Sequence, residues 1–429
     1  MTHYDACMQA KEILPAEQTS PYRWVMALVA GILMTISFIS LTAFSIVSSS
    51  IAQTIGVGKG TLDAYGVDAF SIGLFVAFFL GHGGLFDARI RTGVLVAQIF
   101  LIVPQFIIPV AGSLEFLVAL RFFQGLMIMM LALFSIQLSG WFRPSERARS
   151  LAFTLGAITL GSAAGGILSG LLSSMSWQDA YYVTGFVMLA GAIIYFVFAR
   201  DPKTQAESMT KAKKARHQGA WKNPMTWIMG VVQIPVTWTL FSIGGFLPAF
   251  SEHLGYTAAK TTDLVIVWGI TGFIAAFIGS IIGDRWSAKG RTNRDIFISR
   301  LRIMSIADAM MGTGALLMIL IGDVSYYYLV IAVMINAFLM MLPPNYWAST
   351  GSVFPLAIMG SAAFGMGLIS NSADAIGPLV SSVLVPDFGW NGVFLIMVVL
   401  AFIGVGINIA VSRMHLPLAP DSQDPELIS

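Results

Sequence analysis

Apolar blocks of about 20 residues recur along the whole chain, separated by short polar segments. A helix that rises ~1.5 Å per residue needs about this length to cross the ~30 Å hydrocarbon layer of a membrane. The blocks lack the alternation of apolar and polar positions, over about ten residues, that marks the strands of a membrane β-barrel. The pattern therefore predicts twelve membrane-spanning helices, at residues 23–47, 66–86, 93–112, 116–140, 150–173, 179–199, 224–250, 262–283, 298–322, 325–349, 356–385 and 389–412.

The composition also favours an all-α integral membrane protein. Of the 429 residues, 56% are hydrophobic and 11% are charged, whereas about a quarter of the residues in soluble domains are charged. The N-terminal residues show no short apolar core followed by a small-residue cleavage site, so no secretory signal is expected. Because Cys7 is the only cysteine, neither an internal disulfide nor a redox or zinc role is expected.

Polarity and charge divide the chain and orient it. The longest polar interior segment separates six predicted helices from six others. With an inside N-terminus, Lys59, Lys260 and Arg121 are the only ones of the 24 Lys and Arg residues outside the cytoplasmic segments, so the positive-inside rule predicts a plasma (inner) membrane protein with both termini cytoplasmic. The predicted organisation is a tail (1–22), an N-terminal six-helix bundle (23–199), a linker (200–223), a C-terminal six-helix bundle (224–412) and a tail (413–429).

The two halves contain similar segments, which indicates an internal duplication. The segment "WFRPSERARSLAF" at 141–153 aligns with "VFPLAIMGSAAF" at 353–364, and "WQDAY" at 177–181 aligns with "WNGVF" at 390–394. Parallel repeats of six helices with a binding site between them are typical of a large class of secondary transporters. The duplication thus favours transport by two halves that rock about a central cavity.

Two motifs add to this repeat. The segment "GGLFDARIR" (83–91) matches the pattern G-x-L-x-D-R-x-G-R at Gly83, Leu85, Asp87 and Arg91, but departs from it at Ala88 and Ile90. The pattern R-x-x-Q-G is matched in full by Arg121, Gln124 and Gly125. With the repeat, these motifs resemble the major facilitator superfamily over nearly the whole chain. The resemblance implies two pseudo-symmetric six-helix bundles and transport by alternating access.

Within that superfamily, the sequence is most similar in character to the anion:cation symporters that import organic acids. Those symporters usually carry an Asp-Arg pair in the first helix, whereas residues 35–52 of this chain carry no charge. The resemblance therefore favours an organic anion as substrate and leaves the coupling ion open.

Acidic and basic residues after the second and eighth predicted helices form a candidate conformational latch. An acid followed by arginines in a short loop can cap helix ends and make charge-assisted contacts that break when the halves move. The alternative is a solvated loop that only sets the topology. The latch candidates are Gly83, Asp87, Arg89, Arg91, Asp284 and Arg285.

Arg121 lies within an apolar block, where a central arginine costs at least ~2.5–3.5 kcal/mol and needs a partner. Counting residues from the cytoplasmic helix ends places Asp68 and Asp374 at a similar depth. Either aspartate could neutralise Arg121 until a substrate carboxylate replaces it, and either could be the proton-coupling site. The alternative is a permanent ion pair that only fixes helix packing.

Further polar and aromatic residues are candidates for substrate contact, although each also fits core packing or an interfacial anchor. Asp308 is expected on a peripheral helix and is not a candidate. The candidates besides Arg121 are Gln124, Gln233, Trp238, Asn345, Tyr346 and Asn371.

The chain shows no phosphate-binding glycine loop, nucleotide fingerprint or metal-ligand cluster, so we expect neither a cofactor nor an enzyme. Its basic loops fit topology better than nucleic-acid binding. The leading hypothesis is proton-coupled symport of a small organic anion by a protein that functions as a monomer, with substrate, protons and the lipid bilayer as its partners. The alternatives are a proton-coupled antiporter that exports drugs or metabolites and a non-transporting membrane sensor.

Overall fold

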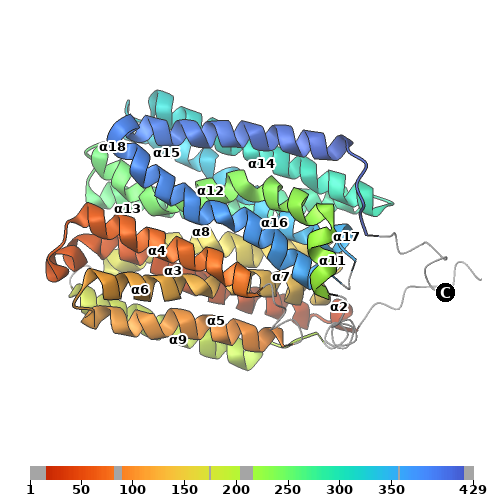
Figure 1. Cartoon of the computed structure of the whole chain (residues 1–429), viewed down its shortest axis with the longest axis horizontal. Coiled ribbons are helices and arrows are strands. Elements are labelled where there is room, and N and C mark those ends of the chain that lie inside the picture. The colour runs from red at the N-terminus through yellow and green to blue at the C-terminus, as the bar shows by residue number, and fades with distance from the viewer. Residues whose placement is uncertain (1–15, 82–88, 173–174, 203–215, 356–357, 420–429) are drawn as a thin grey trace, which may run out of the picture.

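The computed structural model describes residues 16–81, 89–172, 175–202, 216–355 and 358–419 of the chain. Over these residues the chain forms helices joined by short turns, and no strand. Most of the helices run side by side along one direction (Figure 1). The predicted all-α membrane fold is confirmed.

The described residues of the first half form eight α-helices and two short 3-10 turns. Its elements are α2 (Ala16–Thr19), α3 (Tyr22–Ile55), α4 (Lys59–Gly81), α5 (Ile90–Ile107), η1 (Ile108–Val110), α6 (Leu114–Gly125), η2 (Leu126–Ile128), α7 (Met129–Trp141), α8 (Arg147–Leu171) and α9 (Trp177–Phe198).

The second half begins after residue 215 and ends with the longest helix. Its elements are α11 (Arg216–Lys222), α12 (Pro224–His253), α13 (Ala258–Ser287), α14 (Asn293–Ile321), α15 (Tyr326–Ala337), η3 (Phe338–Met341), α16 (Leu342–Ala348), α17 (Thr350–Val353) and α18 (Met359–Arg413).

The described part of the chain has eleven helical spans long and apolar enough to cross a membrane, and the last of them is double. α18 has 55 residues, which at ~1.5 Å per residue is far longer than one crossing of ~30 Å. It is interrupted at Gly389, whose φ of 64° lies in the left-handed region that favours glycine. The predicted crossings at 356–385 and 389–412 are therefore two helices that meet at Gly389.

Several helices extend beyond the apolar blocks that predicted them. α3 continues to Ile55 instead of ending at residue 47, and α4 begins at Lys59 instead of residue 66. Hydropathy marks only the lipid-facing length, whereas backbone hydrogen bonding continues where polar side chains face water. The extra turns of α4 carry Lys59 and Asp63, which line a pocket described below.

The two halves lie against each other along several helices. In Figure 1 the first half, coloured red to yellow, lies below the second half, coloured green to blue. Contacts between the halves join α8 to α13 and α16, α4 to α18, and α3 to α12. Gly269 of α13 allows a close approach of the two backbones, because a Cβ there would lie 2.4 Å from the Thr159 backbone oxygen of α8.

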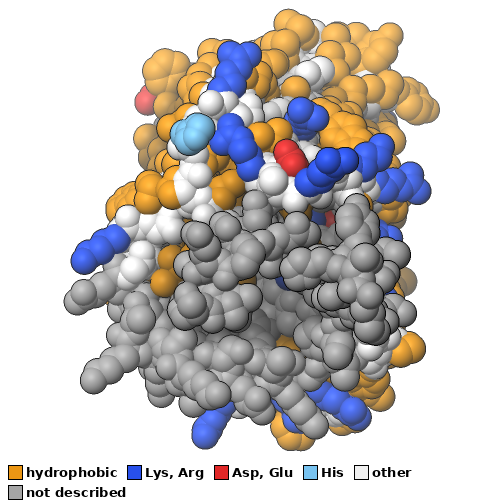
Figure 2. All heavy atoms as spheres, turned by 90° about the vertical axis from the view of Figure 1, so that its right-hand side faces the viewer, with side chains coloured by type: hydrophobic (Ala, Val, Ile, Leu, Met, Phe, Trp, Pro, Cys, Tyr) orange, Lys and Arg blue, Asp and Glu red, His pale blue; other side chains and the backbone are white. Residues whose placement is uncertain are grey.

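α2, α11, α17 and the last residues of α18 all lie at the right-hand end of the helices in Figure 1. We call this the α2 end and the other the opposite end. Figure 2 looks onto the α2 end and shows several Lys and Arg side chains on the part of this face that is not drawn in grey. The described chain thus starts and finishes at the same end, as an even number of crossings requires.

Candidate functional site

Arg121 lies in α6, where two glycines bring this helix against α4. A Cβ on Gly125 would lie 2.1 Å from the Phe70 backbone oxygen, and a Cβ on Gly73 would lie 2.1 Å from the Phe122 backbone oxygen. The glycine of the R-x-x-Q-G motif therefore permits backbone contact between the two helices. This contact positions Arg121 inside the first half, fully buried.

The Arg121 guanidinium is held by neutral acceptors. Its Nη1 donates to Oε1 of Gln124 at 2.8 Å and to the backbone oxygen of Ser40 at 3.4 Å. Its Nε donates to the backbone oxygen of Gly66 at 3.3 Å. These acceptors come from α6, α3 and α4, so the arginine joins three helices of the first half.

Two aromatic rings enclose the same guanidinium. Its Cζ lies 4.3 Å from the ring centroid of Phe44 and 4.7 Å from that of Phe70. Such cation-π contacts stabilise a cation more strongly where water is excluded. The Nη2 atom has no hydrogen-bond partner among the described residues. One donor of a buried cation is therefore free to receive an acceptor.

The ion pair predicted for Arg121 is absent from this structure. No described carboxylate forms an ion pair with it. Gly66 and Phe70 both face Arg121, and since successive helix residues turn by about 100°, Asp68 points to the other side of α4. Asp374 lies in α18 of the second half. Pairing by either aspartate is thus wrong for this state.

Gln124 continues the polar contacts of Arg121 across the first half. Its Nε2 donates to Oε1 of Gln105 at 2.8 Å, and Nε2 of Gln105 donates to Oγ1 of Thr184 at 2.7 Å. The sequence analysis missed Gln105 and Thr184. Two amides inside the apolar block at 93–112, Gln98 and Gln105, were the available signal, because an amide buried in a membrane needs a polar partner.

Four predicted residues lie on two helices of the second half that pack together. Thr237 Oγ1 of α12 donates to the Ser370 backbone oxygen of α18 at 2.8 Å and so fixes this contact. Among the described residues, Oε1 of Gln233, Nε1 of Trp238 and both carboxyl oxygens of Asp374 have no hydrogen-bond partner. The four residues are Gln233, Trp238, Asn371 and Asp374.

Asn345 and Tyr346 do not form a substrate surface in this structure. Nδ2 of Asn345 donates to the backbone oxygens of Gly279 and Met341, both at 3.0 Å. Tyr346 is fully buried, with its ring perpendicular to that of Trp347. In this state the Asn345 amide is bound to backbone and the Tyr346 ring is enclosed, and a substrate role for either residue stays a prediction.

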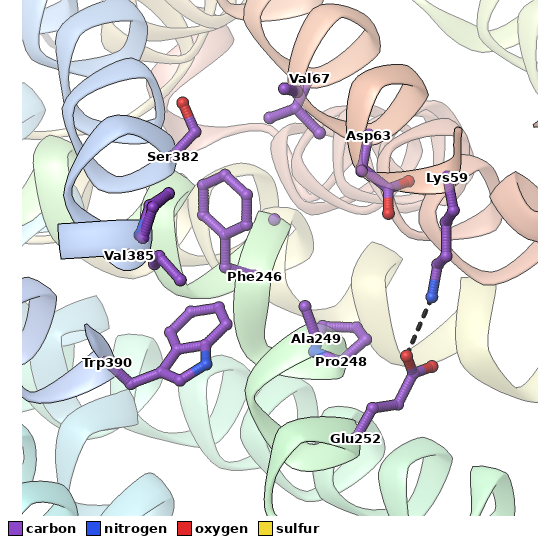
Figure 3. Close-up of a pocket in the computed structure, with 14 residues that line it drawn as sticks. Lys59, Asp63, Val67, Phe246, Pro248, Ala249, Glu252, Ser382, Val385 and Trp390 are labelled. Atoms are coloured by element: carbon purple, nitrogen blue, oxygen red, sulfur yellow. Dashed lines mark hydrogen bonds and ion pairs between the residues drawn. The ribbon is translucent and has the colours of Figure 1, made fainter. Parts of the chain in front are cut away.

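A pocket of about 320 Å³ lies between the two halves at the opposite end (Figure 3). α4 contributes Lys59, Asp63 and Val67 to its lining, and α12 and α18 supply the other walls. Val67 lies next to Asp68, and a Cβ on Gly245 of α12 would lie 3.5 Å from a Val67 methyl. The predicted proton site Asp68 is therefore the next residue of α4 after Val67, which lines this pocket.

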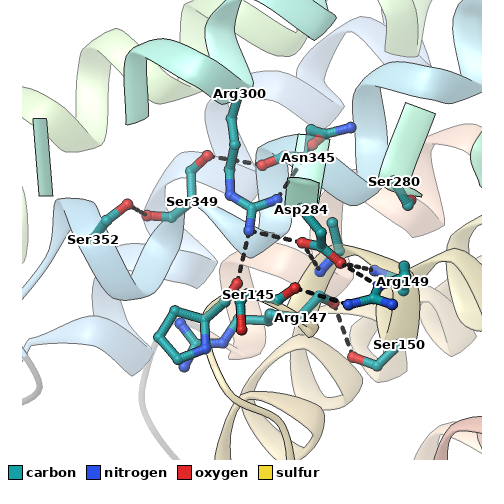
Figure 4. A network of polar contacts seen from close by, with 12 residues as sticks. Ser145, Arg147, Arg149, Ser150, Ser280, Asp284, Arg300, Asn345, Ser349 and Ser352 are labelled. Atoms are coloured by element: carbon teal, nitrogen blue, oxygen red, sulfur yellow. Dashed lines mark hydrogen bonds and ion pairs between the residues drawn. The ribbon is translucent and has the colours of Figure 1, made fainter. Parts of the chain in front are cut away.

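At the α2 end, Asp284 of α13 joins the two halves (Figure 4). Its Oδ2 accepts from the backbone N–H of Arg149 at 3.0 Å and from Nε of Arg149 at 3.1 Å. Its Oδ1 accepts from the backbone N–H of Ala148 at 3.3 Å. The carboxylate thus caps the first turn of α8, where the helix dipole favours a negative charge.

Arg300 of α14 completes this cluster, and the sequence analysis missed it. Its Nη2 donates to Oδ1 of Asp284 at 3.0 Å and to the Pro144 backbone oxygen of the first half at 2.9 Å. Its Nη1 donates to Oδ1 of Asn345 at 3.3 Å. The side chains of Arg300 and Asp284 are both 1% exposed. We call Asp284, Arg149 and Arg300 the latch cluster.

Comparisons with known proteins agree with this architecture. A family model described as the Major Facilitator Superfamily matches residues 28–373, well over half of the chain. The chain belongs to the major facilitator superfamily. The resemblance inferred from the repeat and motifs is confirmed, and so is the expectation of a transporter rather than an enzyme.

Individual members of the superfamily are more distant. A hexuronate transporter from Bacillus subtilis is 24% identical over 297 residues, which cover 65% of this chain and 68% of that protein. A 4-hydroxybenzoate transporter from Pseudomonas aeruginosa is 29% identical over 192 residues, which cover 44% of this chain and 42% of that protein. The crystal structure of the human organic anion transporter MFSD10 superposes with a TM-score of 0.70 at 14% identity, over 91% of this chain and 100% of that one. This last likeness shows the superfamily fold alone.

The superfamily loop motif after α4 lies only partly within the described residues. Gly83 and Asp87 lie outside the described residues. Arg91 contacts the first half itself, since its backbone N–H donates to Oδ1 of Asp201 at 3.0 Å and its guanidinium lies 4.4 Å from the Phe196 ring centroid. Burial raises the pKa of the Asp201 carboxyl, against the lowering effect of that bond. In this state these contacts of Arg91 therefore lie within the first half, and a latch role for it stays a prediction.

The remaining latch candidates, Arg89 and Arg285, are exposed. Asp308, expected on a peripheral helix, is instead fully buried in the superfamily fold. Its Oδ2 accepts from Nδ2 of Asn408 at 2.9 Å, and a Cβ on Gly404 would lie 2.8 Å from that oxygen. The Asp308 carboxyl therefore lies on the face of α14 that α18 packs over.

Proposed function

We propose that this protein is a secondary active transporter that takes up a small organic anion together with protons. The observation that carries the proposal is the Arg121 guanidinium, which is fully buried, has no carboxylate partner among the described residues and keeps Nη2 unbonded. A buried cation without a counter-ion is costly in a membrane protein. A substrate carboxylate would supply the missing charge.

The printed names of the relatives favour the same class of substrate. Hexuronate and 4-hydroxybenzoate are both carboxylates, and two further relatives from rice and Arabidopsis thaliana are named a probable anion transporter and an ascorbate transporter. The chain covers 50% or less of the rice, Arabidopsis and Pseudomonas proteins. For this chain an organic anion is thus a proposal that agrees with the Arg121 environment.

Transport would proceed by alternating access of the bundles at 23–199 and 224–412. The Lys and Arg side chains at the α2 end favour its placement in the cytoplasm, with both termini there. The latch cluster would then close the cytoplasmic end, and the pocket of Figure 3 would face outward. Gln233, Trp238 and Asn371 remain candidate contacts for the anion from the second half.

We assign the proton to Asp68 in preference to Asp374. Asp68 is half-buried and follows Val67, which lines the outward pocket, and its Oδ1 has no partner among the described residues. Asp374 is fully buried. A proton carrier must exchange protons with water on one side of the membrane during the cycle. In this state the partly exposed Asp68 is better placed for this exchange than the enclosed Asp374.

Replacing Asp68 with Asn should uncouple uptake from the proton gradient. The amide keeps the size of the side chain but cannot gain or lose a proton. We expect gradient-driven accumulation in proteoliposomes to disappear, while exchange of labelled for unlabelled substrate continues. Asp374→Asn is the matched comparison and should retain accumulation. The assignment fails if Asp374→Asn abolishes accumulation and Asp68→Asn does not.

The proposed function itself is tested by uptake of labelled carboxylates into proteoliposomes. Glucuronate, ascorbate and 4-hydroxybenzoate form a suitable panel. An inward proton gradient should cause accumulation of at least one of them, and dissipation of the gradient with a protonophore should remove it. Accumulation that requires an outward proton gradient would support an exporting antiporter instead. Absence of uptake and binding for every carboxylate would refute an organic-anion transporter.

A further inference from the structure

The outward pocket has walls of two kinds. The charged side chains among its lining residues are Lys59 and Asp63 of α4 and Glu252 of α12. Phe246 of α12 and Trp390 of α18 supply aromatic surface on the other side (Figure 3). A volume of about 320 Å³ lies within the range of about 300–1,000 Å³ that small-ligand sites occupy. The pocket thus combines one cation and two carboxylates with aromatic walls.

Lys59 and Glu252 form an ion pair between the two halves. The Nζ and Oε2 atoms lie 2.9 Å apart, and the side chains are 37% and 51% exposed. Exposed ion pairs contribute little, because water solvates both partners well when they separate. An incoming anion can therefore displace Glu252 from Lys59 at small cost. The same exchange at the buried latch cluster would be far more difficult.

We propose that this pocket is an outer binding site for organic acids with a single negative charge. The substrate carboxylate pairs with Lys59 in place of Glu252, and the body of the substrate packs against Phe246 and Trp390. Ser382, which also lines the pocket, can bond to a hydroxyl group of the substrate. The inference deepens the proposed function and rests on it. In the proposed cycle the substrate passes from this outer site to Arg121.

The acidic residues of the pocket determine its charge selectivity. Once a substrate carboxylate pairs with Lys59, this lysine no longer neutralises Glu252 or Asp63. A second carboxylate on the substrate would then face like charges, which disfavours dianions without weakening the binding of monoanions to the same extent. The site therefore favours monocarboxylates over dicarboxylates of similar size.

The ion-pair exchange also orders the transport steps. While a substrate carboxylate occupies Lys59, the Lys59–Glu252 contact between the halves cannot form. When the substrate moves inward, Lys59 is released and pairs with Glu252 again. The opposite end therefore closes behind the substrate, which prevents closure on an anion that is still in the outer site.

Two substitutions separate this role from a structural one. Lys59→Gln removes the cation, whereas Glu252→Gln removes its competitor and leaves Lys59 free. We expect the KM for glucuronate or 4-hydroxybenzoate uptake to rise about three- to fivefold in Lys59→Gln and to fall by a similar factor in Glu252→Gln. A purely structural ion pair would instead give changes in the same direction, and that result would overturn the inference.

Charge selectivity is tested with matched acids. Glucarate is glucuronate with a second carboxylate, and terephthalate is 4-hydroxybenzoate with its hydroxyl replaced by one. Each dianion should inhibit wild-type uptake at least tenfold more weakly than its monoanion, and Asp63→Asn together with Glu252→Gln should reduce that difference. Equal inhibition of the wild type refutes the selectivity. If both Lys59 and Glu252 variants keep wild-type KM while Arg121 variants lose uptake, the outer site fails and the proposed function stands.

Discussion

Replacing Arg121 with Lys should reduce kcat/KM for anion uptake by about 100-fold. Lysine keeps the positive charge, but its single ammonium group cannot bond Gln124, Ser40 and Gly66 at once and still offer a donor to the substrate. Hydrogen bonds to charged groups contribute ~1.5–3 kcal/mol each, and ~1.4 kcal/mol corresponds to a factor of ten. The loss of one or two such bonds accounts for the expected factor.

Initial rates in proteoliposomes measure this effect, and thermal unfolding in detergent shows whether the variant is folded. Arg302→Lys is the matched control, since the same exchange at an exposed position of α14 should leave uptake unchanged. Arg121 would be part of the scaffold only if Arg121→Lys bound and transported the anion like the wild type. A folded variant with a tenfold or greater loss of binding supports a direct contact.

Replacing Asp284 with Asn should open the α2 end. The amide has the same size but no charge, so Arg300, which is 1% exposed, loses its counter-ion and the first turn of α8 loses a charged cap. Removal of one partner from a buried ion pair costs ~3–5 kcal/mol. Because the latch cluster forms only when the halves meet, this cost acts on the state seen here. The population should shift about 100-fold toward the state open at this end.

Cysteine labelling can measure that shift. Cys7 is the only native cysteine, so Cys7→Ser gives a cysteine-free background. Ser287 is buried about one turn beyond Asp284, and Ser287→Cys should react with a maleimide much faster when Asp284→Asn is added. Arg285→Gln, next to Asp284 but exposed, should leave the labelling rate unchanged. Equal labelling of the Asp284→Asn and parent proteins would exclude a latch at Asp284.

The fold could be predicted because a bilayer imposes a length on every crossing. Hydropathy located the crossings, but it marks only the length in contact with lipid. The ends of each helix depend instead on where backbone hydrogen bonding stops. Residues 48–55 and 59–65 extend α3 and α4 beyond the apolar blocks, and polar side chains such as Ser49, Gln53 and Thr61 are exposed there. The boundary between the last two crossings was predicted close to Gly389, but the backbone angle that forms the joint cannot be read from hydropathy.

The candidate site could be predicted only in part, because sequence gives the depth of a residue along a helix better than its direction. Arg121 and Asp68 were expected at a similar depth, but Arg121 contacts the side of α4 that carries Gly66 and Phe70, whereas Asp68 lies on the other side of that helix. Asp284 was found from its loop motif, while its partner Arg300 was counted as a charge that sets topology. Arg300 lies 16 residues after Asp284 in the sequence, and the two side chains meet only when α13 and α14 pack together.

The Lys59–Glu252 pair makes the two ends of the protein respond differently to the surrounding medium. Dissolved electrolyte screens charges that lie in water, with a Debye length of about 8 Å at physiological ionic strength. The rim of the outward pocket is open to those ions, whereas the side chains of Asp284 and Arg300 are enclosed. A rise in external sodium chloride therefore loosens the outward closure and leaves the inward closure intact, so a salty medium biases the transporter toward its outward-open form.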